Sequence, residues 1–359
     1  MNTRLSNKQK WLKTINLTSD DELYIGIDVH KISYHIAFWL NGAPAINFVT
    51  PADNRKTVQM LQRFAPAIKL IVYEAGPTGY SLARLMLKNK LPIKITAPSM
   101  TPRQAAQQSK TDSIDYKKLA KYAAKGLLKY VAIPTIQQEA NRQMARTRQI
   151  LIEKQRRVKL QIKSFLLQHG IPQPQGLSCW SNIAIEKLSK ITLSKQLRYC
   201  LDLLLEQLHF IKAQISKLEK ETKEYFEKSH LDKKVKLLQT HPGIGPTIAR
   251  QFATEIFNPK RFKNSTQISK YLGLAPTINQ SGQTLRDGPI SKTGRPAFRS
   301  NLIEASWIWI RKDPLALKTY KRIVSNTGQK NKAITAMARK LTIHLWKMSC
   351  DNKPFVAQF

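Results

Sequence analysis

Acidic residues are the class that this sequence lacks most. Its 359 residues include only 23 Asp and Glu against 60 Lys and Arg, so the formal net charge is +37 at pH 7. Such an excess favours a polyanionic partner. Nucleic acid is the usual one, because each phosphate that a basic side chain neutralises releases condensed counterions.

Long apolar runs and paired cysteines are missing as well. The first twenty residues contain no apolar core of the about 7 to 15 residues that a secretory signal needs. No segment approaches the roughly 18 apolar residues of a membrane span, and no basic amphipathic helix suits a membrane surface. The cysteines are few and far apart (Cys179, Cys200 and Cys350), which argues against a disulfide framework or a zinc site. We therefore expect a soluble cytoplasmic protein, associated with the nucleoid and without a membrane partner.

The few acids of the first third of the chain stand at notable positions. Residues 1–130 contain eight of them. Asp28 ends the short apolar run 24–27, and Glu74 ends the run 69–73 before a glycine-containing turn. Asp112 and Asp115 are three residues apart at the start of a predicted helix, so they share one helical face. Half of these eight acids therefore gather at strand ends or on one helix face.

Two interpretations of these four carboxylates stay open at this point. Each alone suits a local role, because a strand-end Asp often caps a turn and acids favour the first turn of a helix. Together they would repel one another unless cations lay between them. Two Mg²⁺ ions about 3.5 to 4 Å apart are the usual arrangement for phosphodiester chemistry, with Mn²⁺ as the alternative ion.

The order of predicted elements indicates the fold of the first domain. Three antiparallel strands, with Asn41-Gly42 as a hairpin turn, precede a helix over 53–64, the Glu74 strand, a helix over 79–90 and a strand over 93–97. A helix follows to about residue 125. This order predicts an RNase H-like mixed α/β sheet, although other α/β folds share it.

The rest of the chain is predicted to be mainly helical. A long basic helix follows residue 133, and apolar residues at steps of four and three over 197–225 form a heptad seam, which indicates either a self-packed helical hairpin or an oligomerisation arm. Residues 235–256 resemble a helix-hairpin-helix element whose Gly243 and Gly245 bring backbone N–H groups to a phosphate, or form only a tight helix connection. Three helices, near 296–311, 314–325 and 330–348, close the chain.

The length also bears on the domain organisation. At 359 residues the chain exceeds the about 250 to 300 residues at which one core usually stops growing. We expect a flexible leader over 1–22, a nuclease-like domain over 23–130, a coiled-coil connector over 131–230 and a C-terminal domain over 231–359.

Several motifs in the same order resemble the DEDD transposases of bacterial insertion sequences. They are YIGID at 24–28, EAGPTG at 74–79, KTDSID at 110–115, PGIG at 242–245, YLGLAP at 271–276, Ser281-Gly282 and ISKTG at 290–294. The resemblance covers about residues 22–345. It implies a RuvC-like nuclease domain joined by a coiled coil to a transposase domain, with a structured noncoding guide RNA encoded in the element.

The resemblance also implies roles for single residues. Asp28, Glu74, Asp112 and Asp115 would bind Mg²⁺, and Ser281 would be the nucleophile that forms a covalent phosphoserine link to DNA. Without the resemblance, a Ser-Gly pair is usually a turn. Further partners would be the element ends, the target DNA and other copies of the chain, as a dimer or tetramer. The residues expected at phosphates, which could instead form a solvated basic face, are Lys31, Arg103, Lys110, Arg286, Lys292 and Arg295.

Three other functions compete with a transposase. A site-specific DNA invertase of the same superfamily would share all of these residues and differ in its DNA sites. A RuvC-like metal-dependent nuclease would use the four carboxylates and water, with Ser281 only a turn residue. A nucleic-acid-binding protein without catalysis would leave the carboxylates unexplained.

Overall fold

The structure is a computed structural model that describes residues 11–357 apart from 13, 99–100, 102–111 and 282–283. The chain divides into two compact units, residues 1–135 and 136–359. The predicted connector and C-terminal domain therefore fall in one unit. None of the helices in the described part of the chain is long and apolar enough to cross a membrane.

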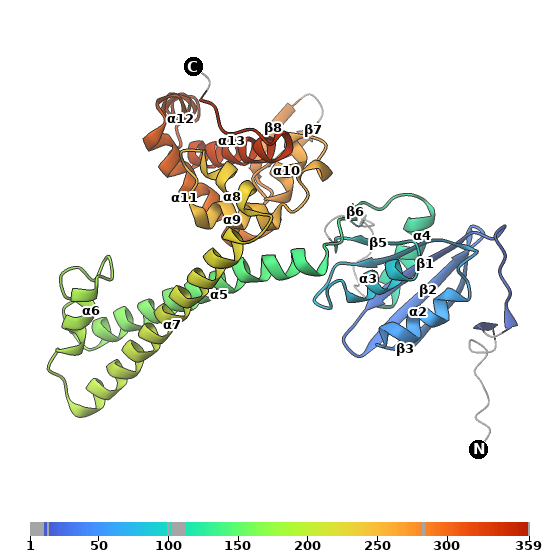
Figure 1. The fold of residues 1–359 in the computed structure, drawn as a ribbon, viewed down its shortest axis with the longest axis horizontal. Coiled ribbons are helices and arrows are strands. Elements are labelled where there is room, and N and C mark those ends of the chain that lie inside the picture. Colours follow the sequence, from blue (N-terminus) through green and yellow to red (C-terminus); the bar gives the residue numbers. More distant parts are fainter. Residues whose placement is uncertain (1–10, 13, 99–100, 102–111, 282–283, 358–359) are drawn as a thin grey trace. The chain divides into compact units, whose positions relative to one another are not determined.

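The first unit is built on a mixed six-stranded sheet in the order β3-β2-β1-β4-β5-β6 (Figure 1). The strands are β1 (Leu23–Val29), β2 (Ser33–Leu40), β3 (Ala43–Pro51), β4 (Ile68–Glu74), β5 (Ile93–Thr96) and β6 (Tyr130–Val131). The predicted antiparallel trio β1–β3 is confirmed, and its turn residues Asn41 and Gly42 both have positive φ, as the tight hairpin requires. The short strand β6 was not predicted.

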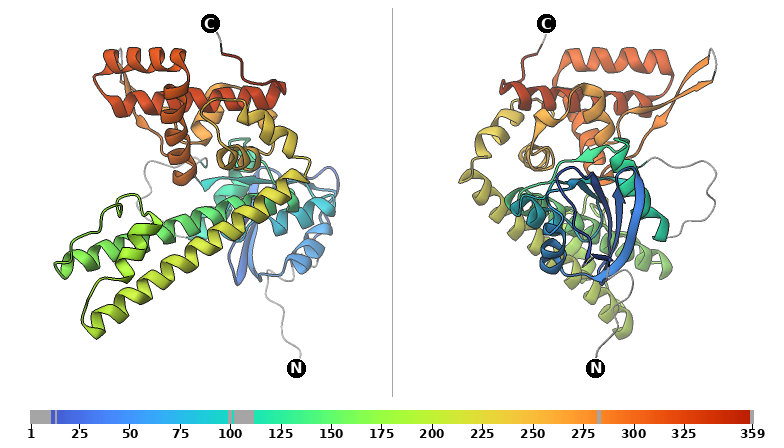
Figure 2. Two further views of the ribbon diagram at one scale, coloured as in Figure 1. Left: turned by 60° about the vertical axis from the view of Figure 1, so that its left-hand side comes forward. Right: turned by 90° about the vertical axis from the view of Figure 1, so that its right-hand side faces the viewer.

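Helices cover both faces of this sheet (Figure 2). Successive residues of a strand point to opposite faces. Leu23, Ile25 and Ile27 of β1 share the main core with α2 (Asn54–Gln62) and α3 (Ser81–Lys88). Tyr24, Gly26 and Asp28 therefore face α4 (Asp112–Ala124) on the other side. Trp11 and Leu17, within the predicted leader, also pack against the main core.

Gly26 allows α4 to lie directly on β1. A Cβ atom at this position would be 2.1 Å from the carbonyl oxygen of Tyr116 and 2.6 Å from the amide nitrogen of Ala120. Only a residue without a side chain permits this approach. The glycine of the first motif therefore determines how closely the helix that carries Asp112 and Asp115 approaches the sheet.

The second unit begins with two long helices, α5 (Ile136–Gln168) and α7 (Lys195–Glu227), which pack side by side. A core of aliphatic residues joins them, including Val158, Ile162, Leu201 and Leu208. The short helix α6 (Asn182–Ser189), which was not predicted, contributes Ala184, Ile185 and Leu188 to that core. Much of the predicted apolar seam is thus used within the chain.

The remaining helices enclose a separate core of the second unit. They are α8 (Asp232–Gln239), α9 (Pro246–Glu255), η2 (Pro259–Arg261), α10 (Ser265–Tyr271), α11 (Pro296–Lys312), α12 (Pro314–Thr327) and α13 (Lys330–Asp351). The three predicted closing helices are confirmed as α11, α12 and α13. Between α10 and α11, β7 (Pro276–Ser281) and β8 (Thr284–Ile290) form an antiparallel hairpin.

Candidate active site

Asp28 and Glu74 lie at one edge of the sheet, on neighbouring parallel strands. Ile27 of β1 is paired with Tyr73 of β4, so the residue that follows each of them is one of the two carboxylates. Asp28 shares a strand face with Gly26, and Glu74 shares one with Val72, which packs against α4 residues. Both acids therefore stand on the face of the sheet that α4 covers.

The backbone of α4 brings its first turn to the same edge. Tyr116 packs edge-on against His35, which is the cross-strand partner of Asp28. Ala120, one turn later, packs with Ala37, with Trp39 beside them. The helix therefore runs from the Asp28 end of β1 towards its beginning.

Asp112 lies one turn before Tyr116 at the start of α4, and Asp115 lies in the same first turn. Their side chains are outside the part of the structure that is described. The backbone therefore places the two residues towards the edge occupied by Asp28.

Several groups contact the two described carboxylates. His30 Nε2 lies 2.9 Å from Asp28 Oδ2. The Thr101 hydroxyl donates a hydrogen bond of 2.7 Å to Glu74 Oε1. Burial, and after it the charge of Asp28, raises the pKa of the Tyr116 hydroxyl, which keeps this group protonated.

Sequence reasoning missed these partners. His30 could have been suspected because it follows Asp28 by two residues at a strand end. Thr101 gave no such signal, because 27 residues separate it from Glu74. Only the pairing of β4 with β5 brings the segment after β5 back towards that carboxylate.

The donor chemistry at this edge suits a hard divalent cation. Asp28 keeps 26% of its side chain exposed, and carboxylate oxygens are the ligands that Mg²⁺ prefers. Among the described side chains, no group of three or more His, Cys, Asp or Glu residues is suitably placed to hold a metal. The metal-binding role of Asp112 and Asp115, whose backbone lies in the first turn of α4, stays a prediction.

Ser281 is the last residue of β7 and is paired with Thr284 at the tip of the hairpin in the second unit. Gly282 lies outside the described residues, and the side chains of Ser281 and Arg286 are not described. The hairpin thus presents the backbone of Ser281 at a strand end, and its hydroxyl role stays a prediction.

Two glycines anchor the base of this hairpin. A Cβ atom on Gly273 would lie 2.1 Å from the Thr293 carbonyl oxygen, and one on Gly294 would lie 2.4 Å from that of Tyr271. The Thr293 hydroxyl donates to the Lys270 carbonyl over 2.7 Å. The motifs at 271–276 and 290–294 therefore pack backbone against backbone at the base of the hairpin that carries Ser281.

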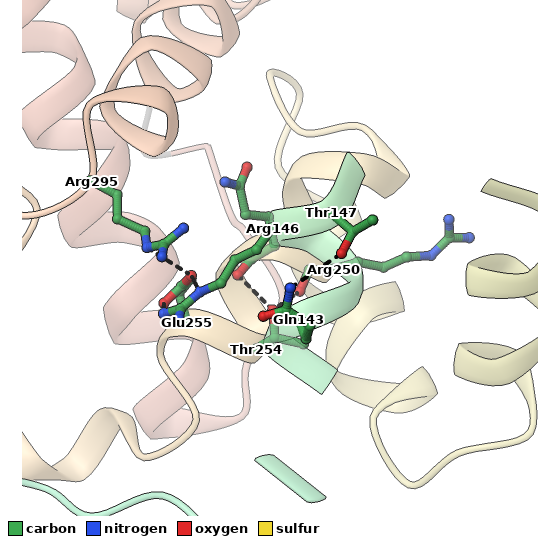
Figure 3. A network of polar contacts seen from close by, with 8 residues as sticks. Gln143, Arg146, Thr147, Arg250, Thr254, Glu255 and Arg295 are labelled. Carbon is green, nitrogen blue, oxygen red and sulfur yellow. Dashed lines mark hydrogen bonds and ion pairs between the residues drawn. The ribbon is translucent and has the colours of Figure 1, made fainter. Parts of the chain in front are cut away.

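The residues predicted to contact phosphate have different surroundings. Lys31 and Lys292 are exposed, whereas Arg103 and Lys110 lie outside the described residues. Arg295 Nε lies 3.8 Å from Glu255 Oε1, a partner that sequence reasoning also missed (Figure 3). Gly245 is exposed at the start of α9.

Gly243 has a structural role of its own. It is buried, and a Cβ atom there would lie 2.7 Å from the Ala305 carbonyl oxygen of α11. Close helix packing is therefore a sufficient reason for this glycine. Of the two glycines predicted at phosphate, Gly245 has the open backbone.

Comparisons with known proteins agree with the motif order. A family model described as a DEDD transposase matches residues 25–171, and a second, described as the transposase IS116/IS110/IS902 family, matches residues 235–321. The chain is 27% identical to a putative transposase of Sinorhizobium fredii, over 92% of this chain and 90% of the relative.

Two further relatives are informative. The transposase for insertion sequence element IS1328 of Yersinia enterocolitica is 25% identical, over 92% of this chain and 98% of the relative. The pilin gene-inverting protein of Moraxella bovis is 29% identical over 35% of this chain and 39% of the relative. Because the two family models match successive regions and the insertion-sequence relatives align over nearly the whole chain, this chain belongs to the DEDD transposase family of bacterial insertion sequences.

Proposed function

We propose that this protein is a DNA transposase, a recombinase that cuts and rejoins the DNA of an insertion sequence through a covalent phosphoserine intermediate. The observation that carries the proposal is the meeting of Asp28, Glu74 and the first turn of α4 at one sheet edge. The family membership supplies the DNA substrate. Site-specific inversion is the second candidate, favoured by the likeness to the pilin gene-inverting protein.

The architecture supports the finer description of each unit. The strand order β3-β2-β1-β4-β5, with β1 antiparallel to β2 and parallel to β4, suits an RNase H-like, RuvC-like domain. The short helices α8 and α9, joined through Gly243 and Gly245, suit a helix-hairpin-helix element. Both assignments place carboxylate chemistry in the first unit and contact with the phosphate backbone in the second.

Asp28, Glu74, Asp112 and Asp115 would hold Mg²⁺, or Mn²⁺ in its place. Bound there, the ion would polarise the scissile phosphate and lower the pKa of a bound hydroxyl. Thr101 holds the Glu74 carboxylate in place through its hydrogen bond. The pKa of the Tyr116 hydroxyl is raised by burial and by the charge of Asp28, so this group stays protonated and adds no negative charge near the carboxylate.

Ser281 would carry the covalent step. Its Oγ, after losing its proton, attacks the phosphorus, and the bond from phosphorus to the leaving DNA oxygen breaks. The leaving oxygen takes up a proton. One phosphodiester replaces another, so a DNA hydroxyl can later reverse the step and rejoin the strands without an external energy source.

The partners of the reaction belong to the same proposal. The quartet and Ser281 lie in different units of the chain. We therefore propose that the serine of one subunit completes the metal site of another, within a dimer or tetramer. A guide RNA encoded by the element would select the DNA, and the residues that would contact backbone phosphates are Lys31, Arg103, Lys110, Arg286, Lys292, Arg295 and Gly245. Gly243, also predicted at phosphate, is buried against α11 and would only shape the turn before α9.

The first experiment is a junction assay. The gene with its native flanking DNA is placed in a heterologous cell, and the excised circular junction is amplified by PCR. Wild type should give the junction, whereas Asp28→Asn and Ser281→Ala should not. Asp53→Asn is the matched acid control, because Asp53 caps α2 and Asn caps equally well. Ser325→Ala, on an exposed face of α12, is the serine control.

The outcomes separate the competing functions. A junction that persists in Ser281→Ala but not in Asp28→Asn would exclude the serine nucleophile, keep the metal-binding carboxylates and assign the attack to water or a DNA hydroxyl. A product in which the DNA between two sites is inverted, without a circle, would favour the invertase. Recovery of activity when Asp28→Asn and Ser281→Ala proteins are mixed supports the shared site, and no recovery counts against it.

A further inference from the structure

Two arginines contact one buried carboxylate in the second unit, and a third arginine lies near enough to affect the pKa of one of them. Glu255, the last residue of α9, keeps only 6% of its side chain exposed. Arg146 of α5 donates from Nε to Glu255 Oε1 over 3.1 Å and from Nη2 to Oε2 over 3.3 Å. Arg295 reaches the same carboxylate from another direction, with its Nε 3.8 Å from Oε1 (Figure 3).

Arg142 is the third cation of this group. It lies one turn before Arg146 on α5, is 5% exposed, and its buried Nε has no hydrogen-bond partner among the described residues. Its guanidinium lies 5.5 Å from the centre of the Phe257 ring. Arg261 stacks on that ring from 4.9 Å and on Tyr271 from 4.7 Å, which extends the positive charge behind the cluster.

The charges of this cluster do not balance. Arg142, Arg146 and Arg295 carry three positive charges, and Glu255 supplies a single negative charge, which Arg146 already binds with two nitrogens. Burial lowers the pKa of Arg295, and the charge of Arg146 lowers it further, against the opposing effect of Glu255. Among the described residues, the acid paired with Arg295 is Glu255, which it shares with Arg146, so its guanidinium has only part of a counter-charge there.

We propose that the arginine cluster formed by Arg142, Arg146 and Arg295 around Glu255 binds one phosphate of a nucleic-acid backbone. Two of the three guanidiniums are open to a ligand, since Arg295 is 49% and Arg146 27% exposed. The planar guanidinium fork matches a phosphate, which offers several acceptor oxygens where a carboxylate offers two. Glu255 orients Arg146 from behind but does not neutralise the cluster.

The arginine cluster lies next to the base of the hairpin that carries Ser281. Arg295 follows directly on the 290–294 segment, whose Gly294 packs against Tyr271 at the base of the Ser281 hairpin. A strand held at Arg295 would therefore be fixed next to the base of that hairpin. That the phosphate belongs to a nucleic acid rests on the proposed function.

A purely structural role makes the opposite prediction for stability. If Arg295 served only to tie the start of α11 to Glu255, its replacement would lower the melting temperature. If Arg295 is a cation waiting for an anion, Arg295→Gln removes repulsion from Arg146 and leaves the ligand-free melting temperature unchanged or higher. Arg295→Lys keeps the charge but loses the planar guanidinium. Phosphate should therefore raise its melting temperature by an amount between those of wild type and Arg295→Gln.

The first test uses inorganic phosphate as the probe, against chloride at the same ionic strength. Phosphate should raise the melting temperature of wild type, and of the control Arg157→Gln, which removes a 74% exposed arginine on α5. The rise should be smaller in Arg295→Gln. An equal rise in Arg295→Gln, or a lower melting temperature of that variant without phosphate, would overturn the proposal.

The second test identifies the source of the phosphate. Binding of a DNA duplex and of single-stranded RNA is measured over a range of salt concentrations in EDTA, so that no cleavage chemistry is involved. Loss of one phosphate contact should reduce the salt dependence, the slope of log K against log salt, by about one in Arg295→Gln. A change with DNA alone or RNA alone names the ligand, and no change with either overturns the proposal. Failure of the junction assay would leave this result unaffected.

Discussion

Replacing Gly26 by alanine tests whether the contact between β1 and α4 assembles the proposed metal site. The new Cβ would lie 2.1 Å from the Tyr116 carbonyl oxygen and 2.6 Å from the Ala120 amide nitrogen, where ordinary contacts begin at 3.4 Å. Both atoms belong to the helix backbone and cannot rotate away. To relieve this overlap and reach an ordinary contact distance, α4 must therefore move away from the sheet by about 1.3 Å, the difference between 3.4 and 2.1 Å.

Such a movement should affect stability and chemistry to different degrees. Overpacking of this kind costs about 1 to 3 kcal/mol of the free energy of unfolding. The first turn of α4, with Asp112 and Asp115, would move with the helix. Because a misplacement of about 1 Å can reduce a rate about 10²-fold, recombination should fall by that order while the protein stays folded.

The assay combines urea denaturation with Mn²⁺ binding followed by electron paramagnetic resonance. Gly243→Ala is a matched control, because its Cβ would meet Ala305 and Trp309 of α11 at 2.7 and 2.8 Å, in the other unit. Both variants should lose stability, but only Gly26→Ala should bind Mn²⁺ more weakly. Wild-type Mn²⁺ affinity and recombination in a folded Gly26→Ala protein would refute the reasoning.

Three further predictions concern the second unit. Burial, and after it the charge of His344, lowers the pKa of His241 to about 3. As the pH falls below about 6.5, the unfolded state therefore takes up a proton at His241 before the folded state does. The free energy of unfolding should drop by about 2 kcal/mol by about pH 5. Urea denaturation at a series of pH values should show a smaller drop in His241→Phe, whereas replacement of the exposed His209 should leave the drop as in wild type. Burial lowers the pKa of Lys234 to about 8. Between about pH 8 and about pH 10.4 the unfolded state therefore binds more protons than the folded state, and the free energy of unfolding should rise with pH. Urea denaturation of Lys234→Met over this pH range should show no such rise. Gly273→Ala should reduce junction formation by about tenfold or more. Gly273 has a φ of +70°, which strains an alanine, and the added Cβ would lie 2.1 Å from the Thr293 carbonyl oxygen, so the base of the Ser281 hairpin would be displaced. Junction levels near those of wild type would show that the hairpin tolerates this shift.

The sequence alone determined much of the fold of both units. Period-two and period-three-to-four patterns are local, so they placed the strands β1 to β5 and the closing helices within a few residues. The pair Asn41-Gly42 predicted its hairpin correctly, because its two positive φ values are a property of these residue types. The motif order also led to the family, which the comparisons show.

Only the tertiary structure decided which distant groups meet. The parallel pairing of β1 with β4 puts Glu74 next to Asp28, and no pattern within either strand encodes that pairing. Thr101 forms a hydrogen bond with Glu74, and Arg146 forms one with Glu255, which is 109 residues away in the sequence. Both hydrogen bonds depend on the packing of the whole core around them. The sequence indicated which residues carry the chemistry. Their neighbours, and the sharing of Glu255 between Arg146 and Arg295, follow from contacts that form only when the elements of each unit pack and exclude water.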